Sequence, residues 1–252
     1  MIRTLLVDDE VIARERLRQL LASITDIEVV GEAADGEEAV QKTLELRPDL
    51  LLLDIQMPGV SGLEVAACLP RPRPKIVFCT AFDAYAVKAF ELQAMDYLLK
   101  PVSPHRLALA VEKIRERPQR DAEEDVDRLT RAVPGASARL LARCGGRYKV
   151  IPQSDVVYFS SEGGLTRLHT RERAYVLEPT LSDLEERLDA ALFFRLSRGV
   201  IVSLDSVTEV RPLVGGTADV ALSNGATLEV SRRRVRELLE RLGGPPAASR
   251  PE

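Results

Sequence analysis

The chain of 252 residues has few cysteines, which argues against a zinc-binding or disulfide-rich protein. It also has no long apolar run, which argues against a membrane-spanning protein. Its three cysteines, Cys68, Cys79 and Cys144, are odd in number and lack the spacing of zinc ligands, which favours reduced thiols in a cytosol. No apolar stretch approaches the roughly 18 residues that a membrane-spanning helix needs. The chain also enters a strand pattern at once, which leaves no room for a signal peptide. We therefore expect a cytoplasmic protein without membrane insertion.

Charge is unevenly distributed, although the formal net charge is only −4. Residues 1–118 contain 15 Lys and Arg against 19 Asp and Glu, whereas residues 138–243 contain 16 against 14. The cations of this second region are arginines, with Lys149 as the exception. A weakly basic carboxyl-terminal half is compatible with nucleic-acid binding but does not by itself indicate it.

The first half of the chain alternates between two kinds of apolar pattern. Strand-like runs occupy residues 2–7, 27–32, 50–53, 75–79 and 95–99. Amphipathic segments with helical spacing lie between them, for example at Ala13, Leu17, Leu20 and Leu21. Strands that alternate with helices predict an α/β fold with a doubly wound parallel sheet. We assign this domain to residues 1–118.

The composition changes after residue 118. Residues 119–137 are rich in charge and predict a linker. The apolar pattern of Val126 and Leu129 is compatible with a helix in this linker, and that alternative stays open. Residues 138–243 contain short strand patterns separated by glycine-rich turns, and predict a mostly β domain. The Asn224-Gly225 pair in this region predicts a type I′ hairpin turn. Residues 244–252, rich in proline and alanine, are predicted to form a disordered tail.

Three apolar runs of the first half end in charged side chains. One run ends in Asp8-Asp9, another in Asp54 and a third in Lys100. The carboxyl ends of strands in an open α/β sheet face one crevice, so these side chains are expected to converge. Clustered carboxylates stay ionised together when a cation joins them, and hard oxygen ligands favour Mg²⁺. The combination predicts that Asp54 attacks a phosphoryl donor while Lys100 neutralises the transferred group.

With these motifs, residues 1–118 resemble the receiver domain of bacterial two-component response regulators. The matching segments are residues 6–10, 52–58, 79–81 and 96–101. The resemblance implies a flavodoxin-like fold with strand order 2-1-3-4-5 and a sensor histidine kinase as partner. It also implies a role for each site residue: Asp54 as phosphoacceptor and metal ligand, Asp8, Asp9 and the Gln56 carbonyl as further Mg²⁺ ligands, Thr80 and Tyr97 as switch residues, and Lys100 as phosphate partner.

Residues 138–243 show no catalytic constellation, because His169 has no nearby cysteine, acid pair or second histidine. The order of residues 156–164, 193–205 and 228–235 instead resembles the LytTR-type DNA-binding domain, which has about ten short strands and contacts DNA through loops. This sequence departs from the family at residues 197–199 and at Ser203, which affects sequence preference more than DNA binding. By position, the resemblance implies that DNA is contacted by Gly164, Leu165, Thr166, Arg198 and Arg233. We expect Arg198 and Arg233 to read bases, and Arg232 and Arg234 to contact phosphates.

The two resemblances together predict a phosphorylation-controlled transcription regulator and not an enzyme. Phosphate on Asp54 would promote a homodimer that binds double-stranded promoter DNA. Two alternatives stay open, namely a docking adaptor whose β domain binds protein and an enzyme regulated by a receiver. The side chains of Arg198 and Arg233 discriminate between DNA and protein as partner. A shared basic face favours DNA, whereas ion pairs with Asp or Glu favour the adaptor.

Overall fold

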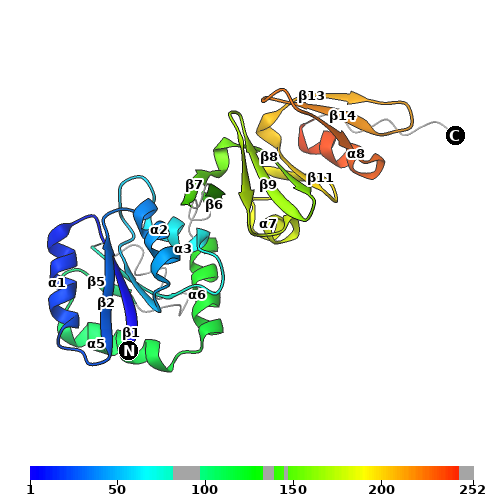
Figure 1. The fold of residues 1–252 in the computed structure, drawn as a ribbon. Coiled ribbons are helices and arrows are strands. Elements are labelled where there is room, and N and C mark those ends of the chain that lie inside the picture. Colours follow the sequence, from blue (N-terminus) through cyan, green and yellow to red (C-terminus); the bar gives the residue numbers. More distant parts are fainter. Residues whose placement is uncertain (82–96, 133–138, 145–146, 244–252) are drawn as a thin grey trace. The chain divides into compact units, whose positions relative to one another are not determined.

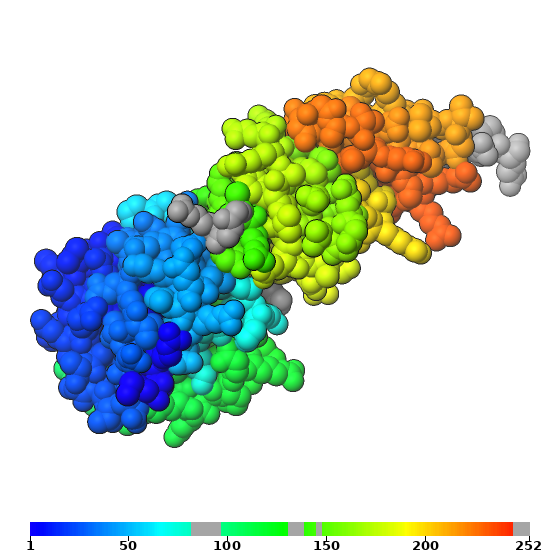
Figure 2. All heavy atoms as spheres, in the orientation of Figure 1, coloured from blue at the N-terminus to red at the C-terminus, as the bar shows by residue number. Residues whose placement is uncertain are grey.

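The computed structural model describes residues 1–81, 97–132, 139–144 and 147–243, which belong to two compact units (Figure 1). The first unit spans Met1–Leu140 and the second Leu141–Glu252. Figure 2 draws their heavy atoms with the same colours by residue number. Within the described residues, no helix is long and apolar enough to cross a membrane.

The first unit is built on a five-stranded parallel sheet in the order β2-β1-β3-β4-β5. Its strands are β1 (Ile2–Val7), β2 (Ile27–Ala33), β3 (Leu50–Leu53), β4 (Lys75–Thr80) and β5 (Tyr97–Leu99). All four residues of β3 are buried, because a central strand of a doubly wound sheet is covered on both faces. The predicted fold class and strand order are confirmed.

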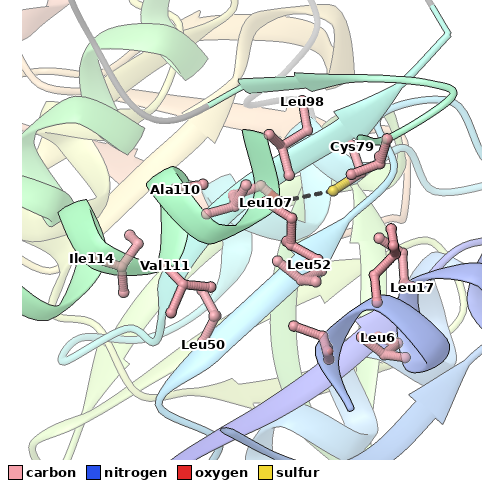
Figure 3. Close-up of a cluster of buried hydrophobic side chains, with 14 residues drawn as sticks. Leu6, Leu17, Leu50, Leu52, Cys79, Leu98, Leu107, Ala110, Val111 and Ile114 are labelled. Atoms are coloured by element: carbon pink, nitrogen blue, oxygen red, sulfur yellow. Dashed lines mark hydrogen bonds between the residues drawn. The ribbon is translucent and has the colours of Figure 1, made fainter. Parts of the chain in front are cut away.

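Two layers of helices cover this sheet (Figure 1). On one face, α1 (Val11–Leu21) and α5 (Pro104–Glu116) pack against alternate residues of the central strands. Figure 3 shows Leu107 and Val111 of α5 beside Leu50 and Leu52 of β3. The other face bears α2 (Gly36–Leu46) and α3 (Gly62–Cys68). Because both layers bury the strand middles, polar side chains are left at the strand ends, where the site lies.

The predicted linker contains a helix that belongs to the first unit. Helix α6 (Gln119–Ala132) packs against α3 and β4, with Ala122, Val126 and Leu129 buried. Its acidic residues Glu123 and Asp127 pair with Arg71 and Arg73, in the segment between α3 and β4, so their charge does not keep the helix in solvent. The compact unit therefore extends beyond the predicted boundary at residue 118. Residues 133–137 and the predicted tail 244–252 lie outside the described residues.

The second unit contains ten short strands within its described residues, as the resemblance implied. A seven-stranded sheet has the order β11-β12-β8-β9-β10-β6-β7, and a second sheet has the order β13-β14-β15. The strands are β6 (Arg139–Cys144), β7 (Arg147–Pro152), β8 (Val156–Glu162), β9 (Leu165–Thr170), β10 (Ala174–Leu177), β11 (Phe193–Ser197), β12 (Val200–Ser203), β13 (Val207–Pro212), β14 (Ala218–Leu222) and β15 (Thr227–Val230).

Two α-helices complete the described part of this unit, α7 (Leu181–Arg187) and α8 (Arg232–Arg241). Phe194, Val202, Val220 and Leu238 join β11, β12, β14 and α8 in one core. The β14–β15 turn is not of type I′, because only Gly225 has a positive φ, of 83°. The side chain of Asn224 instead accepts a hydrogen bond from the Ala226 N–H at 3.1 Å.

Candidate functional site

The three carboxylates and the lysine predicted from the strand ends lie together at the carboxyl edge of the first sheet. Lys100 Nζ is 2.6 Å from Asp54 Oδ2 and 2.7 Å from Asp8 Oδ2. Asp8, Asp9 and Asp54 each offer a carboxylate oxygen, and these oxygens all lie within 4.8 Å of one another. The backbone links the same strands, since the Asp54 N–H donates to the Val7 carbonyl at 2.8 Å. The pocket is thus built by parallel strands that end at one edge.

Burial makes the charges of this pocket costly. Asp8 is fully buried and Asp54 is 5% exposed, whereas Asp9 is exposed. Burial raises the pKa of Asp8 above its ordinary value, against opposing contacts with Lys100 and the Glu10 N–H. Burial by itself lowers the pKa of Lys100, but its contacts with Asp54 and Asp8 raise that pKa overall. The lysine is therefore held as a cation between the two acids.

One oxygen of Asp8 is left without a well-directed hydrogen bond. Among the described residues, Asp8 Oδ2 is buried and accepts no hydrogen bond of acceptable geometry, although Lys100 Nζ lies 2.7 Å away. A buried carboxylate oxygen whose contact with Lys100 is poorly directed, beside two further carboxylates, is a donor set that suits a hard divalent cation. The Gln56 side chain is exposed, and its backbone N–H donates to Asp54 Oδ1 at 3.1 Å, which places the Gln56 backbone beside the acids. The residues present thus fit Mg²⁺.

Thr80 and Tyr97 lie on the two strands beside the pocket. Thr80 ends β4, and its hydroxyl is buried without a hydrogen-bond partner among the described residues. Its carbonyl accepts a hydrogen bond from the Lys100 N–H at 2.9 Å, which joins it to the end of β5. Tyr97 is half-buried and pairs with Phe78, two residues before Thr80 on β4. Thr80 is therefore a neighbour of Lys100, whereas Tyr97 lies at the start of β5, three residues before the lysine.

In the second unit, the first predicted DNA-contacting loop is the turn between β8 and β9. Gly163 and Gly164 have positive φ angles of 59° and 80°, and Leu165 is 49% exposed. Thr166 is only 5% exposed, because strand alternation directs it to the buried face of β9. The prediction that Thr166 contacts DNA is therefore corrected, whereas Gly164 and Leu165 stay accessible.

Arg198 and Arg233, in the second and third predicted segments, are both exposed. Within the part of the chain that the structure describes, neither arginine forms an ion pair with Asp or Glu. Backbone contacts bring their segments to one edge of the unit. The Ser161 N–H donates to the Gly199 carbonyl at 2.9 Å, and Ser231 Oγ donates to the Leu196 carbonyl at 3.4 Å. This arrangement is the one expected for DNA and not for the protein-binding alternative.

Comparisons with known proteins agree with both halves of this description. Residues 4–112 match the response regulator receiver domain family, and residues 146–243 match the LytTr DNA-binding domain family. The transcriptional regulatory protein BtsR of Salmonella typhi is 41% identical over 247 residues, which cover 96% of this chain and 100% of the relative. The chain belongs to the LytTR-type response regulators.

Two further proteins are similar to parts or to most of this chain. The sensory transduction protein LytT of Bacillus cereus is 32% identical over 240 residues, which cover 94% of this chain and 98% of the relative. The solved receiver domain of AraT, a response regulator from Geobacillus stearothermophilus, is 40% identical, has a TM-score of 0.41 and covers 46% of this chain and 93% of its own. As a LytTR-type response regulator, the protein is a DNA-binding transcription regulator under phosphorylation control. Its receiver domain implies a histidine kinase as partner.

One residue that supports the pocket of this response regulator was missed in the sequence, and one arginine of the second unit has contacts other than those expected. A Cβ atom on Gly62 would lie 2.0 Å from the Asp54 carbonyl oxygen, so only glycine lets the start of α3 approach the pocket. Arg234, expected to contact phosphates, places its guanidinium 4.4 Å from the Phe194 ring centre and donates to the Arg195 carbonyl at 2.9 Å. It therefore stabilises the domain edge instead of extending into solvent. The signal for Gly62 was available, since a glycine follows the Asp54 loop at the start of a helix.

Proposed function

We propose that Asp54 accepts a phosphoryl group from a sensor histidine kinase or a small phosphodonor, with Mg²⁺ as the cofactor. The position of Lys100, within 2.7 Å of Asp8 and Asp54 in a cluster of three carboxylates, carries this proposal. Asp8, Asp9, Asp54 and the Gln56 carbonyl would hold the ion. When bound, the ion offsets negative charge on the transferred group.

The transfer is a displacement at phosphorus. An Asp54 carboxylate oxygen forms a bond to phosphorus while the bond from phosphorus to the histidine nitrogen of the kinase breaks, and the nitrogen keeps that electron pair. Lys100 stabilises the charge on the phosphoryl oxygens through its ammonium group, which is already held at the pocket. The receiver thus catalyses its own phosphorylation, and slow hydrolysis of the aspartyl phosphate returns it to the starting state.

Intact-mass measurement tests this assignment directly. The wild-type chain should gain one phosphoryl group from acetyl phosphate in the presence of Mg²⁺ and none in the presence of a chelator. Asp54→Asn keeps the side-chain shape but removes the nucleophilic carboxylate, so it should stay unlabelled. Asp155→Asn, which alters an exposed acid in the second unit, serves as the matched control and should be labelled as wild type. Labelling of Asp54→Asn at the wild-type rate would reject the assignment.

Phosphorylation should act as a population shift between two receiver states. The buried Thr80 hydroxyl has no partner among the described residues and is available to bond the phosphoryl oxygens. Its movement would vacate space that Tyr97 enters, which changes the surface around β5. We propose that this surface forms a homodimer, because a two-fold assembly matches paired DNA half-sites. Sedimentation with and without acetyl phosphate measures the mass, and an unchanged mass at micromolar concentrations would count against dimerisation.

The second unit is proposed to bind promoter DNA through Gly164, Leu165, Arg198 and Arg233. The exposed, unpaired state of the two arginines supports this assignment. The planar guanidinium of arginine matches the O6 and N7 acceptors of guanine, so Arg198 and Arg233 are assigned to base contacts. Anisotropy with a duplex selected by the protein from a random pool tests the assignment. Binding that ignores DNA sequence but responds to an added protein partner would favour the adaptor instead.

A further inference from the structure

The β11–β12 turn, which bears Arg198, is held by the Arg195 side chain, by a longer hydrogen bond of 3.3 Å from the Gly199 N–H to Ser197 Oγ, and by the Ser161 N–H, which donates to the Gly199 carbonyl at 2.9 Å. Arg195 lies on β11, three residues before Arg198, and a register shift in the β11–β12 pairing falls between Arg195 and Ser197. A turn at such an irregularity has few ladder hydrogen bonds to fix it. The guanidinium of Arg195 supplies others, since its Nε donates to the Ser197 carbonyl at 3.0 Å and its Nη2 donates to the Arg198 carbonyl at 2.5 Å.

The third nitrogen of the same guanidinium is anchored on α7. Arg195 Nη1 lies 2.8 Å from Glu185 Oε2, and the Arg195 side chain is only 18% exposed. All three guanidinium nitrogens thus have acceptors, which fixes the plane of the group. A cation occupied in this way is not free to contact a phosphate, although its position near the DNA-facing edge would suggest that role.

The backbone of Arg195 connects the turn to the third DNA-facing segment. Its carbonyl accepts the hydrogen bond from Arg234 Nε at 2.9 Å, and Arg234 lies on the first turn of α8 beside Arg233. The neighbouring Leu196 carbonyl accepts from Ser231 Oγ at the cap of the same helix. Arg195 therefore lies where the segment of Arg198 meets the segment of Arg233.

We infer that Arg195 is a positioning residue for sequence recognition, which acts by holding the Arg198 turn and does not itself contact DNA. The inference rests on the proposed role of Arg198 in base contact. A side chain that reads a base must be placed accurately, because the hydrogen bonds to a base edge depend on direction as well as distance. Loss of the clamp should therefore reduce discrimination between sequences, while the charge that attracts DNA in general stays in place.

The test uses the full chain, a duplex that the protein selects from a random pool, and a random duplex of equal length. Arg195→Lys keeps the charge, but one ammonium group cannot reproduce the planar three-acceptor contact. We expect affinity for the selected duplex to fall about tenfold, the loss of roughly one charge-assisted hydrogen bond. Affinity for random DNA and the slope of affinity against salt should not change. Arg211→Lys is the matched control, since Arg211 is exposed and pairs only locally with Glu209.

A double-mutant cycle shows whether Arg195 acts through Arg198. Arg198→Ala should reduce affinity for the selected duplex, and Arg195→Lys should add little further loss in that background. Glu185→Gln should give a smaller loss in the same direction and provides a second variant if Arg195→Lys does not fold by circular dichroism. Fully additive losses from Arg195→Lys and Arg198→Ala would overturn the inference.

The remaining outcomes separate this inference from the proposed function. Wild-type affinity of Arg195→Lys for the selected duplex overturns the inference alone, provided that Arg198→Ala still weakens binding. Equal losses on both duplexes would show that Arg195 supports DNA binding in general and not the discrimination between sequences, and would also overturn it. No loss from Arg198→Ala would reject the base contact of Arg198, and the inference with it.

Discussion

The phosphorylation pocket and the α6 docking site, where Arg71 and Arg73 contact α6, are two regions of buried charge in the same unit, and they differ in the balance between acids and cations. At the docking site, Arg73 is 4% exposed and its guanidinium lies 2.7 Å from Asp127 Oδ1, with a further hydrogen bond to the Leu69 carbonyl. In the pocket, the carboxylates of Asp8, Asp9 and Asp54 share one cation, Lys100, and the buried Thr80 hydroxyl has no hydrogen-bond partner among the described residues. A balanced buried ion pair holds the fold, whereas an excess of carboxylates around one lysine can take up a cation.

The same distinction separates the arginines of the second unit. Arg195 and Arg234 are occupied by acceptors of the protein, and they hold the edge of the domain. Arg198 and Arg233 are exposed and have no acidic partner in the described residues, so they are available to DNA. Charge by itself therefore does not distinguish a structural arginine from one that binds a ligand. The partners of each arginine do.

Removing the acid of the docking site should have the largest effect on stability. Asp127→Ala leaves the buried Arg73 without its charge partner, which should lower the free energy of unfolding by about 3 kcal/mol. Urea denaturation of the full chain measures the change. Glu124→Ala on the same helix is the control, because the Arg120–Glu124 pair is exposed and should contribute less than about 0.5 kcal/mol. Equal effects of the two changes would show that the Arg73–Asp127 pair is no more important than a surface pair.

Removing an unpaired arginine should instead affect recognition and leave stability unchanged. Arg233→Ala should cost about 1–3 kcal/mol in binding to the selected duplex and little in binding to random DNA. Fluorescence anisotropy on both duplexes measures the difference, and Arg211→Ala serves as control. Equal losses on the two duplexes would assign Arg233 to phosphate contact.

Removing an acid from the pocket should change stability in the opposite sense from removing Asp127 at the docking site, and it should also abolish the response to Mg²⁺. Three close carboxylates repel one another, so Mg²⁺ at tenfold over its dissociation constant should stabilise the wild-type chain by about 1.4 kcal/mol. Asp8→Asn removes one of the repelling charges, so in a chelator its melting temperature should equal or exceed that of wild type. It should also lose the response to Mg²⁺. If Asp8→Asn is strongly destabilised in a chelator, Asp8 stabilises the fold as Asp127 does, and the prediction is wrong.

The smallest predicted effect concerns His169 and pH. His169 stacks on Tyr158 with ring centres 4.0 Å apart, and its Nε2 lies 2.9 Å from Ser160 Oγ. Burial lowers the pKa of His169 below its usual value, so the unfolded chain binds the proton more readily than the folded chain. The stabilising contribution of neutral His169 is therefore present above the ordinary histidine pKa and decreases as the pH falls through it. Between pH 7.5 and pH 5.5, the melting temperature of His169→Gln should fall less than that of wild type. Equal falls in melting temperature would reject this role of His169.

The convergence of Asp8, Asp54 and Lys100 could be predicted from the sequence because each of them follows a recognisable apolar run. Asp8, Asp54 and Lys100 end strands of a parallel sheet, and parallel strands present their carboxyl ends at one edge. The docking site was missed for the converse reason. Asp127 lies in a charged segment that is typical of a linker, and its partner Arg73 is more than 50 residues away, so only packing reveals the pair.

The DNA-facing edge was predicted in part. Arg198 and Arg233 could be assigned by their segments, but Thr166 was assigned by loop position, although strand alternation places it on the same face as the buried Leu168. The role of Arg195 could not be read at all, because it depends on carbonyl groups of the adjoining turn and on an acid from another helix. Backbone acceptors leave no pattern in the sequence.

The central claim is that a phosphoryl group on Asp54 controls DNA binding. It is tested most directly by the affinity of the full chain for its selected duplex, measured by anisotropy with Mg²⁺ and with or without acetyl phosphate. The wild-type chain should bind more tightly after phosphorylation, and Asp54→Asn should show the same affinity under both conditions. An equal response of Asp54→Asn, or a fully phosphorylated wild-type chain whose affinity is unchanged, would contradict the account.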